Sequence, residues 1–210
     1  MAASGLFPAD FQIALKGLVA VHHSIYARVP PQGIYFEALV ENALRATRRP
    51  FTPIEAAARN QPTHDLPVLD TGLSLKTETG YGTHPTQIDI TKLCTTEREP
   101  WEPNVPLPRA MEHLSRYDLI LMLRAIWTLP IVRYQLVEIP IELLGRMRAA
   151  RLEPVGKRAG RQSLGADALG NGGEPLFHVH FDGSDGKCQI RNLGLAHCDV
   201  LTTWDISVPV

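Results

Sequence analysis

Residues 64–79, which read HDLPVLDTGLSLKTET, contain the pattern that decides the expected fold. Apolar residues alternate with polar ones on both sides of the run Asp-Thr-Gly at 70–72, and that run is rich in turn-forming residues. The pattern predicts two short antiparallel strands, over residues 65–69 and 73–79, that are joined as a tight hairpin.

Side chains on the second strand of this hairpin alternate between the two faces of a sheet. Ser74, Lys76 and Glu78 therefore share one face, and Leu75 points to the other. The hairpin also returns Asp65, at the start of the first strand, to a place alongside Lys76. Carboxylates beside an ammonium group are suited to a divalent metal ion and an activated water, so the hairpin is the candidate site for metal-dependent hydrolysis.

The elements on either side of the hairpin combine helices and strands. Spacing and alternation of apolar residues predict an α/β fold with a mixed β-sheet core flanked by helices. The apolar run at 117–127 fits a buried strand and a buried helix equally well. The predicted helices cover residues 11–25, 34–46, 53–59, 109–116 and 142–150, and the other predicted strands cover 87–93, 134–141, 176–182, 187–193 and 200–208.

The length of 210 residues suits a single domain with one active site. Within residues 1–210 we expect a catalytic core over residues 1–150 and a C-terminal β-rich region over 176–210. Between them, residues 151–175 are rich in Gly, Arg, Lys, Ser and Ala and poor in bulky apolar side chains. This composition predicts a flexible basic loop.

The overall composition is that of an ordinary globular protein, with 44% hydrophobic and 20% charged residues and a net charge of −1. No apolar run approaches the roughly 20 residues that span a bilayer, and residues 1–11 lack the features of a secretory signal. Three cysteines without a Cys-x-x-Cys pair predict free, mostly buried thiols. We therefore expect no membrane association and a cytoplasmic location.

Arginine dominates the basic residues, since only five of the 21 are lysines. The guanidinium fork suits phosphates and guanine edges, which favours a nucleic-acid partner, although a GC-rich genome produces the same bias. His178 and His180 share a strand face, and without a third ligand they indicate a structural or recognition role and not a metal site. The candidate phosphate contacts are Lys157, Arg158 and Arg161, for which a solvated loop is the alternative, and the candidate base contacts are Gln189, Arg191 and Asn192.

The hairpin resembles that of the PD-(D/E)xK nucleases, in which an acid begins one hairpin strand and an acid-x-lysine lies on the next. His-Asp at 64–65 followed by Ser-Leu-Lys at 74–76 is similar to that pattern. The runs at 74–80 and 88–93 are similar to a stretch of type II restriction endonucleases. The resemblance covers about residues 33–93. It implies a restriction-endonuclease-like fold with a C-terminal recognition region, and a Mg²⁺-dependent endonuclease that leaves 5′-phosphates.

The resemblance also implies roles for individual residues. Asp65 and a glutamate would hold Mg²⁺, the Leu75 carbonyl would add a ligand, and Lys76 would position the attacking water. The chain departs from the pattern at His64, where the family has proline, and at Ser74, where a hydroxyl replaces the second acid. The candidates for the missing carboxylate are Glu37, with Glu41 one turn further along the same predicted helix, Glu78 and Asp89.

The partners implied by the resemblance are double-stranded DNA, a second copy of the chain and a cognate methyltransferase acting on the same site. A homodimer would supply one catalytic centre for each DNA strand. The alternatives are another PD-(D/E)xK nuclease, such as a repair, recombination or phage exonuclease, and a catalytically inactive DNA-binding relative. A chance match to a small-molecule enzyme or interaction domain is disfavoured, because the sequence has no phosphate-binding glycine motif or nucleophile elbow.

Overall fold

The computed structural model describes residues 5–52, 66–68, 71–95, 102, 105–156 and 162–208. The chain divides into two compact units, each of which is built on a five-stranded sheet. Unit 1 consists of Met1–Pro85, Tyr117–Ile139 and Cys198–Val210, and unit 2 of Thr86–Arg116 and Pro140–His197. The combination of mixed sheets and helices confirms the predicted α/β class.

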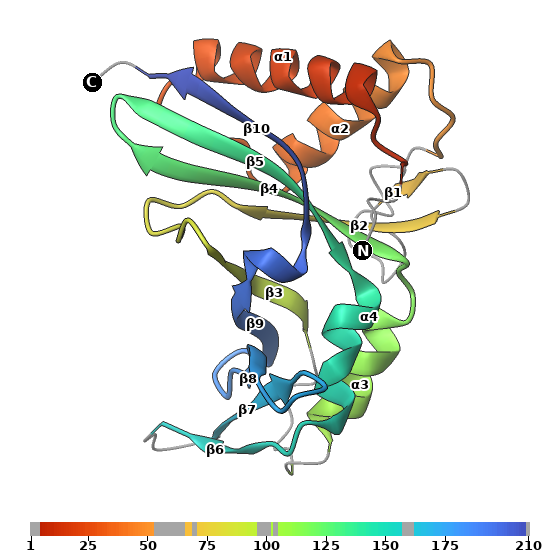
Figure 1. Cartoon of the computed structure of the whole chain (residues 1–210), viewed down its shortest axis with the longest axis vertical. Helices are drawn as coiled ribbons and strands as arrows, with labels where there is room; N and C mark the ends of the chain where they lie inside the picture. The colour runs from red at the N-terminus through yellow and green to blue at the C-terminus, as the bar shows by residue number, and fades with distance from the viewer. Residues whose placement is uncertain are drawn as a thin grey trace. The chain divides into compact units, whose positions relative to one another are not determined.

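Sheet A of unit 1 has the strand order β1-β2-β4-β5-β10 (Figure 1). β2 and β4 are parallel, whereas β1 with β2 and β5 with β10 are antiparallel. The hairpin predicted from the sequence is therefore present as β1 and β2, with β2 in the interior of the sheet. The strands are β1 (Leu66–Val68), β2 (Thr71–Glu78), β4 (Leu119–Thr128), β5 (Ile131–Pro140) and β10 (Asp199–Ser207).

Two helices, α1 (Ala9–Ile25) and α2 (Ile34–Ala46), lie over one face of sheet A (Figure 1). Their apolar stripes pack on the sheet residues that alternate toward them, which forms the core of unit 1. The opposite face of β2 is thereby left to the polar series that begins at Ser74. The core includes Phe11, Leu15 and Val19 of α1, Phe36, Val40 and Leu44 of α2, Leu73 and Leu75 of β2, and Leu121 and Leu123 of β4.

The apolar run at 117–127, for which helix and strand fitted equally well, forms most of strand β4. Residues 119–125 are all buried, so both faces of the strand are covered. A strand that pairs in parallel with β2 and is buried on both sides needs a nearly continuous apolar sequence, which removes the alternation that identifies most strands.

Sheet B of unit 2 has the order β3-β9-β8-β7-β6 and is antiparallel throughout. Helix α3 packs against the 3₁₀ helix η2, which also contacts β7. The strands are β3 (Gln87–Thr95), β6 (Glu153–Val155), β7 (Ser163–Leu169), β8 (Pro175–Phe181) and β9 (Lys187–Gly194), and the helices are α3 (Pro106–Leu114), α4 (Ile141–Leu144), η2 (Gly145–Ala149) and η3 (Leu195–His197).

The loop expected across residues 151–175 is wrong for 153–155 and 163–169, which form β6 and β7. β7 places Leu164 and Ala168 on its buried face, and four of its seven residues are serine, glycine or alanine. Small residues give little hydrophobic signal, and the strand is stabilised by pairing with β8 along its length. Residues 157–161 lie outside the described part of the chain.

Two further expectations differ from the structure. The C-terminal β region divides, since β8 and β9 belong to sheet B whereas β10 pairs with β5 in sheet A. The helix predicted over 142–150 is a single turn, α4, followed by η2. The helix predicted over 53–59 lies outside the described residues.

The cysteines are free, as expected, with Cys94 and Cys188 buried and Cys198 half-buried. Within the described ranges, no helix has the length and apolar character that a membrane span requires.

Candidate active site

The polar face of β2 carries the residues expected to perform the chemistry. Ser74 is buried, and Lys76 and Glu78 are half-buried. The parallel neighbour β4 places Met122 opposite Lys76 and Arg124 opposite Glu78. The structure therefore brings Ser74, Lys76 and Glu78 to one face of an interior strand, with a second cation on the adjacent strand.

The most strongly constrained charge at this face is Arg124, whose side chain is 0% exposed. Its Nε donates to Glu78 Oε2 at 2.6 Å, and its Nη1 donates to Gln135 Oε1 at 2.7 Å. Its Nη2 donates to the backbone carbonyl of His84. These bonds occupy all three nitrogens of the guanidinium group and hold one oxygen of the Glu78 carboxylate in place.

Burial of a cation without a counter-charge is costly, so Glu78 is required by Arg124 as well as available to a metal ion. Sequence reasoning missed Arg124. The signal was present, because it is the one charged residue in the apolar run at 117–127 apart from Asp118 at its start. A buried charge on an interior strand must have a partner, and the adjacent strand is the first place to look.

The two glutamates of α2 are candidates for the missing carboxylate, and the start of this helix contacts β2. The backbone N–H of Gly33, the residue before the helix, donates to Thr77 Oγ1 at 3.5 Å. This contact brings the start of α2 next to the part of β2 that carries Lys76. Glu37 is one turn into the helix. Glu41 is 9% exposed and forms an ion pair with Arg45 at 3.3 Å. Of the candidates for the missing carboxylate, Glu78 shares a strand face with Lys76.

Two other candidates are not placed beside Lys76 by the structure. Asp65 lies outside the described residues. Asp89 is on β3 of unit 2, where its Oδ1 accepts a hydrogen bond from the backbone N–H of Asn192 at 2.8 Å. That bond spans the β-bulge at which Asn192 adopts a left-handed φ of 56°. Asp89 therefore has a structural contact within unit 2.

The polar face of β2 carries the type of donor atom that a magnesium ion prefers. Mg²⁺ prefers hard oxygen ligands, and this face offers the Glu78 carboxylate and the Ser74 hydroxyl beside Lys76. Within the described ranges, no group of three or more His, Cys, Asp or Glu side chains could hold a metal ion. Asp65 is thus the residue that the expected ligand set still needs.

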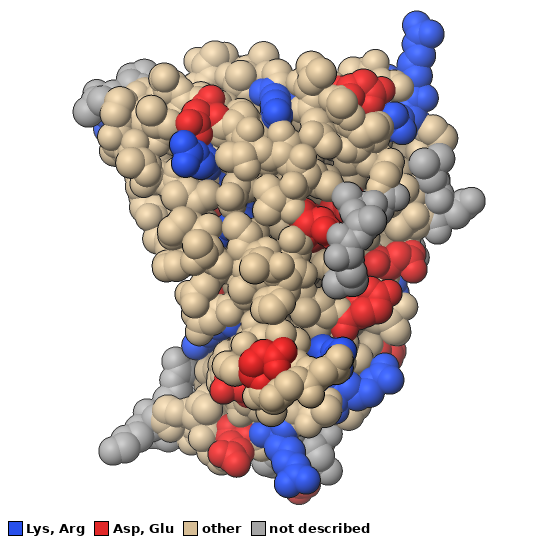
Figure 2. Space-filling view, viewed as in Figure 1, with Lys and Arg blue, Asp and Glu red and all other residues tan. Residues whose placement is uncertain are grey.

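The candidate base contacts lie on β9 of unit 2. Arg191 and Gln189 are half-buried and bonded to each other, and Asn192 is exposed at the bulge. The candidate phosphate contacts Lys157, Arg158 and Arg161 fall outside the described residues. Charges of both signs are mixed on the face drawn in Figure 2, in keeping with the net charge of −1.

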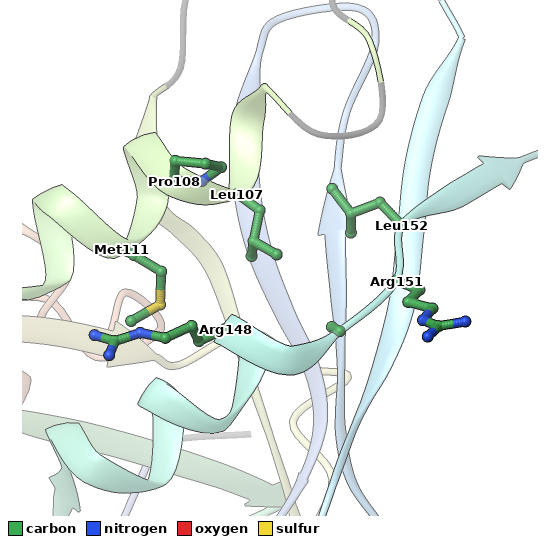
Figure 3. A pocket seen from close by; sticks show the side chains of 7 residues that line it. Leu107, Pro108, Met111, Arg148, Arg151 and Leu152 are labelled. Carbon is green, nitrogen blue, oxygen red and sulfur yellow. The ribbon is translucent and has the colours of Figure 1, made fainter.

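An apolar pocket of about 590 Å³ lies in unit 2 between α3 and the residues at and after the end of η2. Leu107 and Met111 of α3 line it opposite Leu152, and Arg148 lies beside Met111 whereas Arg151 points away from it (Figure 3). Among the described residues that line the pocket there is no carboxylate, imidazole or thiol. This pocket therefore lacks the groups for hydrolysis.

Comparison with known proteins identifies the family. Residues 2–206 match the SmaI family of type II site-specific deoxyribonucleases. The chain belongs to this family. It is similar to the type II restriction enzyme SmaI of Serratia marcescens, with 32% identity over 158 residues. The similarity covers 73% of this chain and 64% of that enzyme, so the match spans a little under two thirds of the relative's length. No solved structure matches the chain significantly.

Membership of the SmaI family confirms the resemblance to type II restriction endonucleases that the hairpin implied. The match extends far beyond residues 33–93 and includes both sheets. The family match therefore covers both the strand with Ser74, Lys76 and Glu78 and the sheet with Gln189 and Arg191.

Proposed function

We propose that this chain is a type II restriction endonuclease that cleaves double-stranded DNA at a specific site and depends on Mg²⁺. The observation that carries the proposal is the set of Ser74, Lys76 and Glu78 on one face of β2 in a member of the SmaI family. A lysine and hard oxygen donors on a common strand face are what phosphodiester hydrolysis requires.

In the proposed mechanism, Asp65 and Glu78 would hold the metal ion, the Leu75 carbonyl would add a ligand, and Glu37 would be the substitute carboxylate. Bound Mg²⁺ would supply Lewis acidity toward the scissile phosphate and the attacking water. Lys76 orients the attacking water and offsets negative charge on the phosphate, and Ser74 contributes a hydrogen bond from beside it. Arg124 holds Glu78 Oε2 so that the carboxylate keeps its orientation. In-line attack on phosphorus leaves a 5′-phosphate and a 3′-hydroxyl.

The proposal includes the partners of a restriction enzyme. Arginine and lysine of the segment at 157–161 neutralise DNA phosphates, and Gln189, Arg191 and Asn192 contact bases. Two copies of the chain form a homodimer, so that each DNA strand meets one catalytic centre. A cognate methyltransferase protects the same site in the host DNA, and both proteins act in the cytoplasm.

The second candidate function is a DNA-binding relative without catalysis. The observation that favours it is Ser74, since a hydroxyl occupies the position at which the family pattern has a metal-binding acid. This candidate predicts sequence-specific binding without cleavage, so one experiment separates the two.

The test is digestion of unmethylated phage DNA with and without Mg²⁺ by the wild type, a Lys76→Ala variant and a Lys16→Ala control. Lys16 lies on α1, which covers the opposite face of sheet A, and its Nζ packs over Trp204. We expect discrete Mg²⁺-dependent fragments from the wild type and the control, and at least a hundredfold loss of rate in Lys76→Ala. A smear indicates an exonuclease, shifted but intact DNA indicates the inactive relative, and intact unshifted DNA contradicts both.

A further inference from the structure

One face of sheet B carries polar side chains in cross-strand register. His178 of β8 is the Cα partner of Asp167 on β7 and of Arg191 on β9. In the next row, His180 is the partner of Gly165 and of Gln189. The alternate positions of these strands, including Phe177, Val179, Phe181, Cys188 and Ile190, are buried.

Arg191 is oriented by its neighbour on the same strand. Its Nε donates to Gln189 Oε1 at 3.0 Å, and its Nη2 donates to the same oxygen at 2.6 Å. Glutamine and arginine two residues apart share a strand face, so the contact costs no change in backbone geometry. The side chain is half-buried, and its direction is set before any ligand arrives.

His178 is oriented by the adjacent strand. Its Nδ1 lies 2.8 Å from Asp167 Oδ1, and a carboxylate accepts hydrogen bonds, so Nδ1 carries the hydrogen. In the neutral ring Nε2 is then an acceptor. The ring lies over Gly165, where an added Cβ would stand 2.6 Å from Nε2. The glycine thus provides the space that the imidazole occupies.

We propose that this face of sheet B, comprising Asp167, His178, Gln189 and Arg191, reads the DNA target in the major groove. The assignment rests on the proposed function and adds His178, with Asp167 and Gly165 as its positioning residues. Arg191 donates to the acceptor atoms on a purine edge, of which guanine presents two. His178 accepts from the exocyclic amino group of a cytosine or an adenine next to it.

The spacing of the two residues suits neighbouring bases. Adjacent strands lie about 4.8 Å apart, and successive base pairs about 3.4 Å apart along the DNA axis. Strand elements of about this width enter the major groove in other DNA-binding proteins. A donor fork and a fixed acceptor side by side distinguish base pairs that a uniformly basic surface does not, since phosphate contacts carry no sequence information.

The experiment uses a duplex library with a randomised central segment and the full-length protein. The library is cleaved in Mg²⁺ and the ends are sequenced, and in parallel it is bound in Ca²⁺ and the bound fraction is sequenced. The variants are Arg191→Ala, His178→Ala and Gly165→Ala. The control is Arg133→Ala in sheet A, an exposed strand arginine that is likewise held by a side chain, Asp205, at 2.9 Å.

We expect Arg191→Ala to lose about tenfold or more of the selectivity at one base pair of each half-site, with the other positions unchanged. His178→Ala relaxes a neighbouring position, and Gly165→Ala relaxes that same position, because the added methyl group displaces the ring. The control keeps the wild-type preferences. A variant whose thermal unfolding shows that it no longer folds is replaced by Arg191→Lys or His178→Gln and judged in the same way.

Unchanged base preferences in both Arg191→Ala and His178→Ala, or a uniform loss of binding, overturn the assignment. If the wild type binds selectively without cleaving, the proposed function fails, and the binding arm still decides the assignment. If the wild type neither cleaves nor binds selectively, both fail.

Discussion

At the scale of single residues, the Glu78–Arg124 pair gives the sharpest expectation. The Arg124 side chain is fully buried and the Glu78 side chain is 11% exposed. Removal of the carboxylate therefore leaves a buried cation without a counter-charge. We expect Glu78→Ala to lower the free energy of unfolding by about 3–5 kcal/mol. The combined variant Glu78→Ala and Arg124→Met should cost less than the sum of the single changes by about 1 kcal/mol or more. Urea denaturation without DNA or metal measures all three.

A surface pair is the matched control for this cycle. Glu112 on α3 forms an ion pair at 3.3 Å with Arg116, which follows the end of the helix. The Glu112 side chain is 73% exposed. Glu112→Ala should therefore change stability by no more than about 0.5 kcal/mol. Additive costs at Glu78 and Arg124 would show that the two side chains do not depend on each other.

The part of the site that the sequence predicts is the part that strand alternation governs. Period two places Ser74, Lys76 and Glu78 on one face, and the structure confirms it. Arg124 is 46 positions from Glu78, and the link depends on the parallel pairing of β2 with β4, which no local pattern specifies. The same limit applies to Asp167 and His178, which meet only once β7 pairs with β8.

At the scale of elements, the docking of α1 on sheet A depends on a buried histidine. His23 Nε2 is hydrogen-bonded to the hydroxyl of Tyr134 on β5, and its Nδ1 lies 3.3 Å from the carbonyl of Ala27. Burial lowers the pKa of His23 below its ordinary value of 6.5, and burial raises the pKa of Tyr134. The neutral imidazole is therefore the form that the interface accepts.

The sign of the pH dependence follows from this depressed pKa. The unfolded chain binds the proton near pH 6.5, and the folded chain binds it only at lower pH, so His23 contributes its stability above pH 6.5. That contribution declines as the pH falls from 6.5 toward the folded pKa. We expect the stability difference between wild type and His23→Gln to shrink between pH 8 and pH 5, measured by urea denaturation. A gap that stays constant over this range contradicts the role of His23.

The sequence predicts an element well when the element's own pattern of apolar and polar residues is enough to specify it. α2 has the predicted bounds, because its apolar stripe and helical spacing are local properties. β7 escaped prediction, because its small residues become a strand through pairing with β8. β10 was predicted as a strand, but its place beside β5 follows from a connection through the Pro140–His197 segment of unit 2.

At the scale of the whole molecule, the proposed homodimer needs an exposed apolar surface that two copies of the chain can bury against each other. Large apolar side chains are exposed where α1 ends and α2 begins, with Ile25 66% and Tyr35 50% exposed. The rings of Tyr26 and Tyr35 have centroids 6.3 Å apart, so these side chains form a cluster. Exposed apolar clusters of this kind mark interaction surfaces. The cluster comprises Ile25, Tyr26, Val29, Ile34 and Tyr35.

We expect sedimentation equilibrium to give twice the chain mass of 23.2 kDa at micromolar concentration. The double change Ile25→Glu and Tyr35→Glu places charges in the cluster and should weaken association by at least tenfold. The control is Ile13→Glu, which should leave association unchanged. Ile13 is 70% exposed, but it lies more than three turns before Ile25 on α1. On a supercoiled plasmid the dimer should give linear DNA directly, because both strands are cut in one encounter. The charged double variant should accumulate nicked circles first. A monomeric wild type that makes linear DNA without a nicked intermediate would contradict the link between dimerisation and double-strand cleavage.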